Sequence, residues 1–288
     1  MIDWINTIAQ GLLLGGLYAL FALGLSLVFG VMRLVNIAHG DLILLAAFLA
    51  IVITSVLNLH PLLSLAILVP LMFILGYVLQ RGLLNFTLGR DILPPLLVTF
   101  GLSILIQNGL LEVFSADSRS LPGGGIETAS FQVTEHLAVG TLPLIIFATA
   151  LVLTAALQLL FARTALGRAF RATSDDQQAA QLMGINNRHI YALATAVAFA
   201  TIAVSGVFLA LRTTIAPTDG PAQLLYGFEA VIIGGLGSIW GTFAGGMILG
   251  VAQAIGFRMD PGWGVLAGHV AFLAVLLFKP TGLLGKGN

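Results

Sequence analysis

The chain offers few residues whose types and spacing could support catalysis. It has no cysteine, which excludes disulfides, thiolate metal ligands and a cysteine nucleophile. Its five histidines are scattered, neither a His-Glu-x-x-His nor a Gly-x-Ser-x-Gly motif occurs, and His269 is expected to be a packing residue. The best Walker-like fragment, at residues 282–286, lacks the spacing of a phosphate-binding loop. We therefore expect no enzymatic activity, no metal site and no cofactor bound by this chain itself.

Polar side chains within apolar stretches are the other candidates, because such groups are costly in a bilayer unless they are paired or line a wet path. Asn36 and His39 have the i, i+3 spacing of one helical face, and Asp41 lies next to them. Taken singly, each is more often structural: His39 and Asp41 would cap a helix at the membrane interface, and Gln107 and Asn108 would bond to neighbouring helices. We assign the following residues to a candidate solute path: Asn36, His39, Asp41, Gln107, Asn108, Glu229, Gly235 and Gly237.

The longest polar segment runs from Arg163 to His189, and we call it the coupling segment. Charge-free apolar stretches flank it on both sides. Its arginines predict a cytoplasmic location by the positive-inside rule. A weakly apolar segment held at the inner membrane surface could be gripped by a partner protein, but an ordinary cytoplasmic loop is equally compatible with these residues. The arginines are Arg163, Arg168, Arg171 and Arg188.

The middle of the coupling segment carries the signals of a short helix. Ser174 followed by Gln177 fits a capping box. Gly184 is well placed to end the helix in a left-handed conformation. The small apolar face of this helix would consist of Ala179, Leu182 and Met183.

Composition sets the class of protein. The chain has 288 residues, of which 58% are hydrophobic and only 8% charged, and its mean hydropathy is +1.04. Soluble domains carry roughly 25% charged residues, so these values indicate an all-α, polytopic helical membrane protein. The formal net charge of zero gives no indication of a nucleic-acid partner. The first apolar run is too long for a signal peptide and predicts a retained first span.

The apolar stretches predict about eight or nine transmembrane helices in a single domain, residues 1–288. Residues 230–257 are charge-free, too long for one untilted helix and short for two. Gly237, Gly241 and Gly245 form a small-xxx-small ladder there, and we predict broken helices divided near 238–241. The remaining spans are expected at 5–32, 42–59, 61–80, 92–111, 137–162, 190–211 and 261–278.

Alternation of these spans gives an orientation. With Asp3 outside, the coupling segment lies inside together with Arg33, Arg81 and Arg90. Dividing the glycine-rich region also places Lys279 and Lys286 inside. We therefore expect an external N-terminus, a cytoplasmic C-terminus and an external loop at residues 112–136.

Three sequence stretches resemble the permease subunits of bacterial ABC importers of the branched-chain amino acid type, specifically the shorter of the two permeases that pair in such systems. The first is 16–30 followed by Val-Asn-Ile-Ala-His-Gly-Asp at 35–41. The second is Thr-Ala-Leu-Gly-Arg-Ala-Phe-Arg-Ala at 164–172, continuing through 178–186. The third is the glycine-rich stretch 233–246. They occur in the expected order and together span nearly the whole chain.

This resemblance implies a coupling helix at 174–187 that docks on a separate ATPase, with Ala179, Ala180 and Gly184 at the positions of a loose Glu-Ala-Ala-x-x-x-Gly pattern. Gln178 departs from the Glu of many importers, a charge that Asp176 could supply instead. The residues assigned to coupling are Arg168, Arg171, Asp176, Gln178, Ala179, Ala180, Met183 and Gly184.

The resemblance also implies partners and a mechanism. The partners would be two ATP-binding ATPase subunits, a second permease that is a copy or a relative, and a periplasmic or surface-tethered solute-binding protein. ATP-driven closure of the ATPases would move the coupling helix and the fifth and sixth spans, switching the path between outward-open and inward-open. The protein would reside in the bacterial inner membrane.

Two alternatives remain at this stage. Related systems carry urea, short amides or aromatic acids, and the mostly apolar path does not exclude them. A secondary transporter or channel would need no ATPase, but it would want a carboxylate near the bilayer midplane. Asp41, Glu112 and Glu229 are all expected near the ends of spans, which argues against this class.

Overall fold

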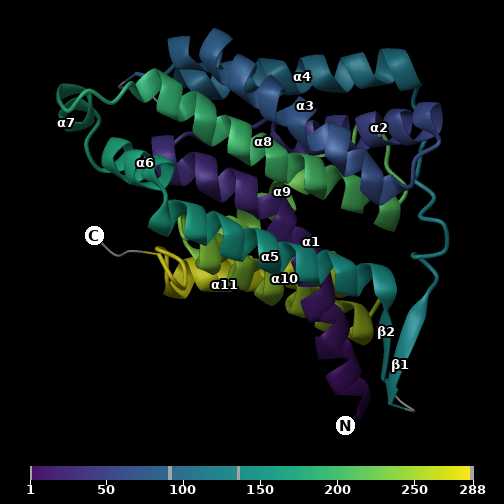
Figure 1. The fold of residues 1–288 in the computed structure, drawn as a ribbon. Helices are drawn as coiled ribbons and strands as arrows, with labels where there is room; N and C mark the ends of the chain where they lie inside the picture. Colours follow the sequence, from purple (N-terminus) through teal and green to yellow (C-terminus); the bar gives the residue numbers. More distant parts are fainter. Residues whose placement is uncertain (1, 90–92, 135–136, 286–288) are drawn as a thin grey trace.

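The computed structural model describes residues 2–89, 93–134 and 137–285 and shows a bundle of long helices with one small β-hairpin (Figure 1). Some residues of the sequence-based predictions lie outside this range. They are Arg90 and Lys286, which contribute to the expected orientation, and residues 135 and 136 of the expected external loop.

The helices confirm the all-α, polytopic class. Among the described residues, seven helices are long and apolar enough to cross a membrane by length and composition: α1, α2, α3 (with the short 3₁₀ turn Leu84–Phe86 that follows it), α4, α5, α8 and α10. Two apolar helices are shorter: α9 has 15 residues and α11 has 16. The expected total of eight or nine spans is reached only when one or both of them are counted as crossing the membrane. The bounds are α1 (Ile2–Met32), α2 (His39–Leu57), α3 (Pro61–Gly82), α4 (Leu93–Phe114), α5 (Thr141–Arg163), α6 (Ala165–Asp175), α7 (Gln177–Leu182), α8 (Asn187–Arg212), α9 (Gly220–Gly234), α10 (Ile239–Met259) and α11 (Trp263–Phe278).

Helices α1 and α8 form the centre of the bundle. Their most apolar windows are 83% and 78% buried, whereas those of α4 and α5 are 17% and 22% buried. Glycines let α1 lie against α10: a Cβ on Gly15 would come within 2.6 Å of Gly246, and one on Gly246 within 2.7 Å of Ala19. Such close backbone approach strengthens helix association in a membrane, where apolar burial alone gives little driving force between helices.

The glycine-rich region is broken, as its length predicted. Helix α9 ends at Gly234 and α10 begins at Ile239, a few residues earlier than expected. Gly235 and Gly237 turn the chain with φ of 106° and 79°, a conformation that side chains with a Cβ disfavour. Ser238 caps α10 by accepting a hydrogen bond from the Gly241 N–H at 3.1 Å.

Helices α2 and α9 begin inside the bundle rather than at its surface. The non-helical residues 33–38 turn back along the end of α1, so His39 lies 2.8 Å from the Phe21 carbonyl, about three turns before α1 ends. The start of α9 lies against the start of α2, because a Cβ on Gly40 would overlap the Gly220 carbonyl oxygen. Asp41 thus lies in the first turn of α2, at the end of a span as expected, but this end lies inside the bundle rather than at its surface.

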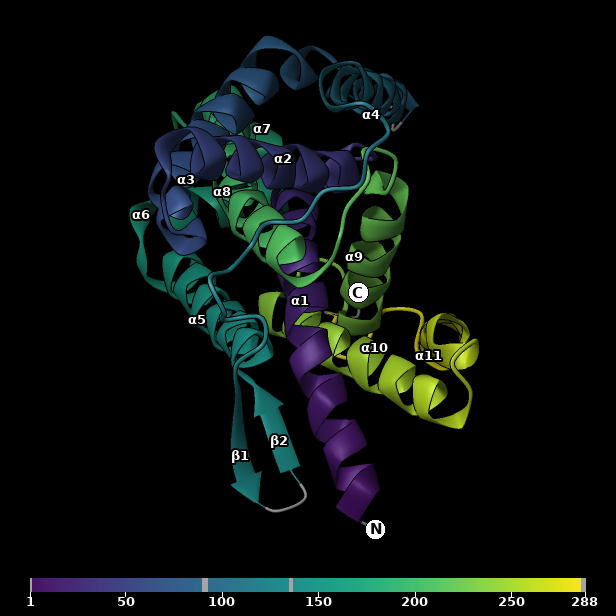
Figure 2. The ribbon, with the colours of Figure 1, turned by 90° about the vertical axis from the view of Figure 1, so that its right-hand side faces the viewer.

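The two ends of the bundle differ. The external loop expected at 112–136 begins within α4 and continues into the hairpin of β1 (Ser130–Thr134) and β2 (Leu137–Gly140), so α5 starts at Thr141 rather than at 137. This hairpin lies at the end opposite α6 and α7 (Figures 1 and 2). The Gln10 amide donates to the Ala138 carbonyl at 2.9 Å and ties the hairpin to the start of α1.

Candidate translocation path and coupling segment

The coupling segment folds into α6 and α7, joined at Asp176. Asp176, not Ser174, caps α7: its carboxylate accepts from the backbone N–H of Gln178 at 2.8 Å and of Ala179 at 3.0 Å. The capping-box prediction is wrong because Ser174 belongs to the end of α6 and donates to the Gly30 carbonyl at 2.7 Å. Gly184 has φ of 85° and ends the turn in the left-handed conformation that we predicted.

Helix α7 exposes apolar side chains at its tip. Leu182 is 89% exposed and Met183 is 83% exposed. Ala179 is also exposed, whereas Ala180 is only 4% exposed and holds the turn against the bundle. An apolar tip outside the apolar spans is the kind of surface that a partner protein covers.

The coupling segment is tied to the ends of three long helices. Ser174 bonds to α1 as described, and the Asn187 amide at the start of α8 donates to the Gln177 carbonyl at 2.8 Å. The Arg171 guanidinium donates to the Phe161 carbonyl in α5, and Phe170 is fully buried with its ring 5.4 Å from that of Phe161. Helix α6 thus contacts α1 and α5, and α7 contacts the start of α8.

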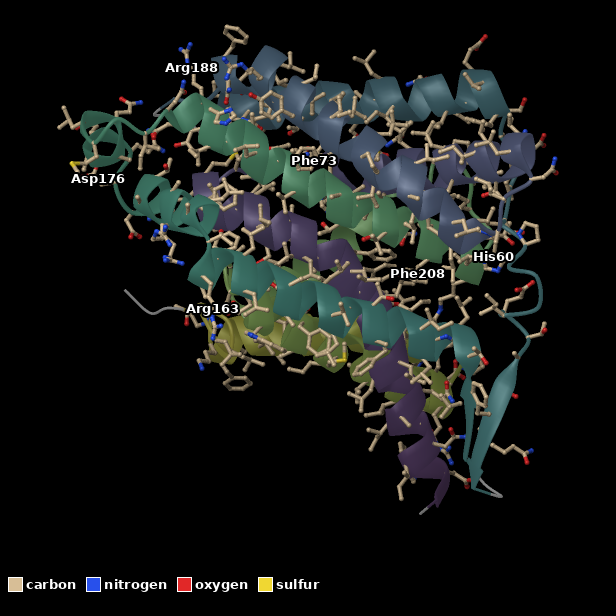
Figure 3. All side chains as sticks on the ribbon, viewed as in Figure 1. His60, Phe73, Arg163, Asp176, Arg188 and Phe208 are labelled. Carbon is tan, nitrogen blue, oxygen red and sulfur yellow. The ribbon has the colours of Figure 1, made fainter. Side chains whose placement is uncertain are left out.

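Basic residues gather at this end of the bundle. Arg163, Asp176 and Arg188 lie at one end in Figure 3 and His60 at the other. Arg168, Arg171 and Gln178 are exposed here. A pocket of about 320 Å³ lies between residues 31–33 and 174–178. The described basic residues at this end are Arg33, Arg81, Arg163, Arg168, Arg171, Arg188 and Lys279, whereas Arg119, Arg212 and Arg258 lie toward the other end.

Asp41 is the centre of the first polar cluster within the bundle. Its two carboxylate oxygens accept from the Ser103 hydroxyl at 2.5 Å and from the Gln107 amide at 2.9 Å. Ser103 lies near the middle of α4, so this carboxylate is deep in the bundle and 1% exposed. Asp41 provides no side-chain cap for α2, which contradicts the interface-capping alternative.

Asn36 and His39 are held by the backbone of the same region. Asn36 precedes α2 and accepts from the Ala38 N–H at 3.0 Å. Asn36 and His39 therefore do not share a helical face, contrary to the prediction from their spacing. His39 bonds to the Phe21 carbonyl in α1. Its ring also lies beside Gly24 of α1, where α1 packs against the middle of α8. Both side chains are buried and fix the unwound segment in place.

Glu229 forms a second deep cluster. Its carboxylate lies 2.5 Å from Nδ1 of His269, near the middle of α11, and is 2% exposed. His269 is therefore a partner of the predicted path residue rather than a packing residue alone. Sequence reasoning missed this pair because the two residues lie 40 positions apart on separate helices.

The other predicted path residues are not brought to these clusters. Asn108 is exposed on α4, and its amide donates to Ile104 of its own helix at 2.8 Å. Gly235 and Gly237 lie near the coupling end, where Gly237 packs against Gly30 and Gly235 against Gly285. Among the described residues, no group of three or more potential metal ligands is found.

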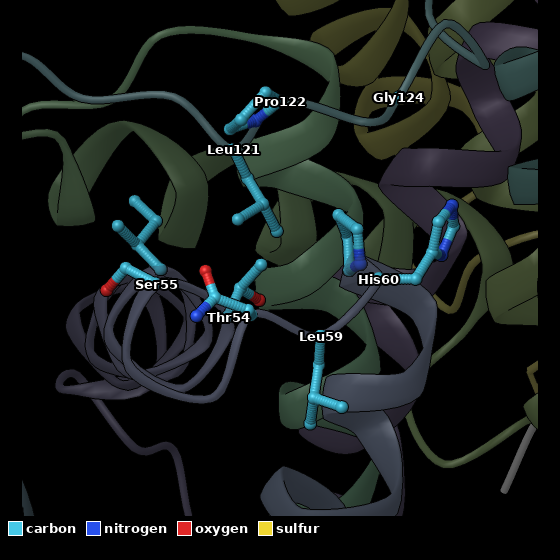
Figure 4. Close-up of a pocket in the computed structure, with 10 residues that line it drawn as sticks. Thr54, Ser55, Leu59, His60, Leu121, Pro122 and Gly124 are labelled. Atoms are coloured by element: carbon cyan, nitrogen blue, oxygen red, sulfur yellow. The ribbon is translucent and has the colours of Figure 1, made fainter.

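A pocket of about 430 Å³ opens at the hairpin end between the end of α2, the start of α3 and residues 121–124 (Figure 4). Thr54, Ser55 and Asn58 supply polar groups, and Leu121 and Pro122 cover one side. Helix α3 begins at Pro61, where the third span was expected, and His60 caps it, because its Nδ1 accepts from the Leu62 N–H at 3.3 Å.

The geometry is that of a helical membrane protein with deep carboxylates and an exposed apolar turn at its basic end. Residues 7–278 match the family model described as branched-chain amino acid transport system / permease component. This chain belongs to that family. The permease is thus of the type found in ABC importers for branched-chain amino acids, as the sequence resemblance predicted, and is a multi-pass protein of the bacterial inner membrane.

Several known proteins resemble the permease. It is 33% identical over 300 residues to the high-affinity branched-chain amino acid transport permease BraD of Pseudomonas aeruginosa, covering 98% of this chain and 96% of the relative. It is 28% identical to the corresponding LivH of Escherichia coli, with 96% and 94% covered. The fructose import permease FrcC of Rhizobium meliloti is 30% identical over 68% of this chain and 58% of its own length.

One solved structure shares the fold of the permease. It is PsaBC from Streptococcus pneumoniae in complex with Fab, with a TM-score of 0.51, 12% sequence identity, and coverage of 98% of this chain and 97% of that chain. At this identity the likeness concerns the fold alone.

Proposed function

We propose that the permease is the membrane-spanning subunit of an ATP-driven importer for branched-chain or other hydrophobic amino acids. The observation that carries this proposal is the exposed apolar tip of α7 at the basic end of the bundle. Within this family, a tip of that kind fits a docking contact for a separate ATPase. The named substrates of BraD and LivH support the amino acid class.

The partners follow from the same proposal. Two ATPase subunits bind ATP and engage α7, a second permease that is a copy or a relative completes the path, and a solute-binding protein delivers the solute at the hairpin end. Closure of the ATPases moves the coupling segment, and this motion passes to α1 through the Ser174–Gly30 hydrogen bond of α6 and to α8 through the Asn187–Gln177 hydrogen bond of α7. The path then alternates between its two openings.

The proposed orientation places the coupling end in the cytoplasm. The distribution of basic residues supports it, because cytoplasmic ends of membrane proteins are enriched in Lys and Arg. The N-terminus then faces the outside with the hairpin, and the C-terminus faces the cytoplasm, since Leu283 and Leu284 bond to the end of α9 beside Gly30.

The depth of two carboxylates bears on the secondary-transporter alternative. Asp41 and Glu229 are both deep in the bundle, so the supposed lack of a deep carboxylate no longer excludes that class. The family of the chain and the exposed tip of α7 favour the ATP-driven importer instead.

Uptake measurements test the proposal. Cells that express the permease with its ATPase and binding-protein partners should take up labelled leucine, and uptake should stop when the ATPases carry a substitution that blocks hydrolysis. Leucine uptake that persists with inactive ATPases would support the secondary-transporter class and overturn the proposal.

A further inference from the structure

The pocket of about 430 Å³ at the hairpin end, which we call the hairpin-end pocket, has firmly held walls (Figure 4). Its covering segment, residues 121–124, is fixed to the end of α8, because the Leu121 N–H donates to the Ala210 carbonyl at 2.8 Å. On the opposite wall, the Leu59 N–H donates to the Thr54 carbonyl at 3.3 Å and fixes the link between α2 and α3. The pocket is therefore part of the fold rather than a gap between loose segments.

The chemistry of the walls selects the kind of occupant. None of the ten described residues that line the pocket is Asp, Glu, Lys or Arg. The His60 ring accepts from the Leu62 N–H through Nδ1, so this ring is uncharged. Apolar side chains such as Ile51 stand beside uncharged polar ones such as Thr54 and Asn58. A free amino acid would bring an ammonium and a carboxylate here without a charged partner, which is costly. The walls instead suit a large uncharged side chain with an apolar body and a polar tip.

The surface around the pocket is acidic. The Glu127 carboxylate lies against the covering segment. Of the arginines at this end, Arg258 pairs with Asp3 at 3.6 Å, and Arg119 and Arg212 are half-buried. Opposite charges on facing surfaces speed association and fix orientation, so this surface complements a basic partner. The described acidic residues exposed at this end are Asp3, Glu112, Asp117, Glu127 and Asp260.

We propose that the hairpin-end pocket and the acidic surface around it form the docking site of the solute-binding protein, which presents a basic surface and inserts a large uncharged side chain into the pocket. This inference rests on the proposed function and names the contact through which the solute is delivered. Binding energy at protein interfaces is concentrated in a few large side chains that fill a pocket of the partner. His60 at the pocket and Asp176 in the coupling segment lie at opposite ends of the bundle (Figure 3), so the two partners bind at opposite ends.

The purified permease–ATPase complex in lipid nanodiscs tests the inference, and the probe is the solute-binding protein loaded with L-leucine. The measured quantity is the concentration of this protein that stimulates ATP hydrolysis to half of its maximum. Ser55→Trp fills the pocket from α2 and Pro122→Trp fills it from the covering segment, because both residues are exposed and line the pocket. Gln132→Trp is the control, since Gln132 is exposed on β1 and lies outside the pocket.

Each pocket variant should raise the half-maximal concentration about tenfold or more, because the inserted side chain loses its place. Gln132→Trp should change it by less than roughly threefold, as is usual for a surface substitution. The melting temperature of each variant reports its fold, and the two pocket variants act from opposite walls, so a folding defect in one leaves the other to decide. Unchanged half-maximal concentrations in folded pocket variants would overturn the inference and leave the proposed function standing.

The acidic surface is tested with Glu127→Lys, which should raise the half-maximal concentration and make it less sensitive to added salt. A lower half-maximal concentration for this variant would contradict the basic partner surface.

Equilibrium dialysis of free L-leucine against the complex, without the solute-binding protein, examines the other occupant. Leucine binding that both pocket variants abolish, with stimulation by the solute-binding protein unaltered, would assign the pocket to the free amino acid and overturn the inference. No stimulation of the unaltered complex would overturn the proposed function and this inference together.

Discussion

At the scale of single residues, the deep carboxylate of Asp41 is held by hydrogen-bond donors rather than by a charge of opposite sign. Asp41 has a donor on each oxygen and no basic partner within ion-pair distance among the described residues. A buried carboxylate without such donors would carry a large desolvation cost. Ser103 and Gln107 therefore make the position of Asp41 tolerable and tie α4 to the start of α2.

Removing one donor tests this account of Asp41. Ser103→Ala should lower the free energy of unfolding by about 1.5–3 kcal/mol, because it leaves one carboxylate oxygen buried and unpaired. Thr149→Ala is the matched control, since its hydroxyl bonds only to Ile145 of its own helix at 2.8 Å. The measurement is the melting temperature of the purified protein in detergent. Equal effects of the two substitutions would contradict a special role for the Ser103 hydroxyl.

At the scale of elements, the bundle depends on glycines that let α1 lie directly against α10. A Cβ on Gly250 would overlap the backbone of Gly11 and Gly15, so the contact tolerates no side chain there. Helix α4 is different, because a Cβ on Gly101 or Gly109 would meet nothing within 4 Å. The same residue type is therefore essential in one helix of this chain and replaceable in another.

Substitution of matched glycines measures this difference. Gly246→Leu should destabilise the protein by more than about 3 kcal/mol, because the added atoms meet the backbone of α1. Gly109→Leu, on the open side of α4, should change the stability little. Size-exclusion chromatography and thermal unfolding in detergent would show the difference. A monodisperse Gly246→Leu protein with an unchanged melting temperature would refute the close α1–α10 contact.

The sequence predicts elements better than it predicts their depth. Hydropathy located the long helices and the glycine break, because length and composition determine which segments suit a bilayer. It could not show that residues 33–38 fold back along α1, which carries Asp41 inward, since that depends on tertiary contacts. The sequence alone does not separate Ser174 from Asp176 as the cap of α7, because both side chains suit a cap and the Ser174–Gly30 bond joins positions far apart in the chain.

At the scale of the whole molecule, the proposed orientation makes the two ends chemically distinguishable. The chain has no cysteine, so single cysteines can be introduced without interference. Thr128 is exposed at the hairpin end and Gln181 at the coupling end. A membrane-impermeant maleimide should label Thr128→Cys in intact cells and Gln181→Cys only after lysis. The reverse pattern would invert the proposed orientation and remove the site for a cytoplasmic ATPase.

The central claim is that α7 is the contact for a separate ATPase, and affinity purification of the complex tests it most directly. Leu182 and Met183 contribute little to the fold, so Leu182→Asp combined with Met183→Asp should leave expression and melting temperature unchanged. Phe131→Asp, an equally drastic change at an exposed position of the hairpin, is the control. We predict that the ATPase co-purifies with the unaltered permease and with Phe131→Asp but is lost from the double variant. Full recovery of the ATPase with the double variant would contradict the account.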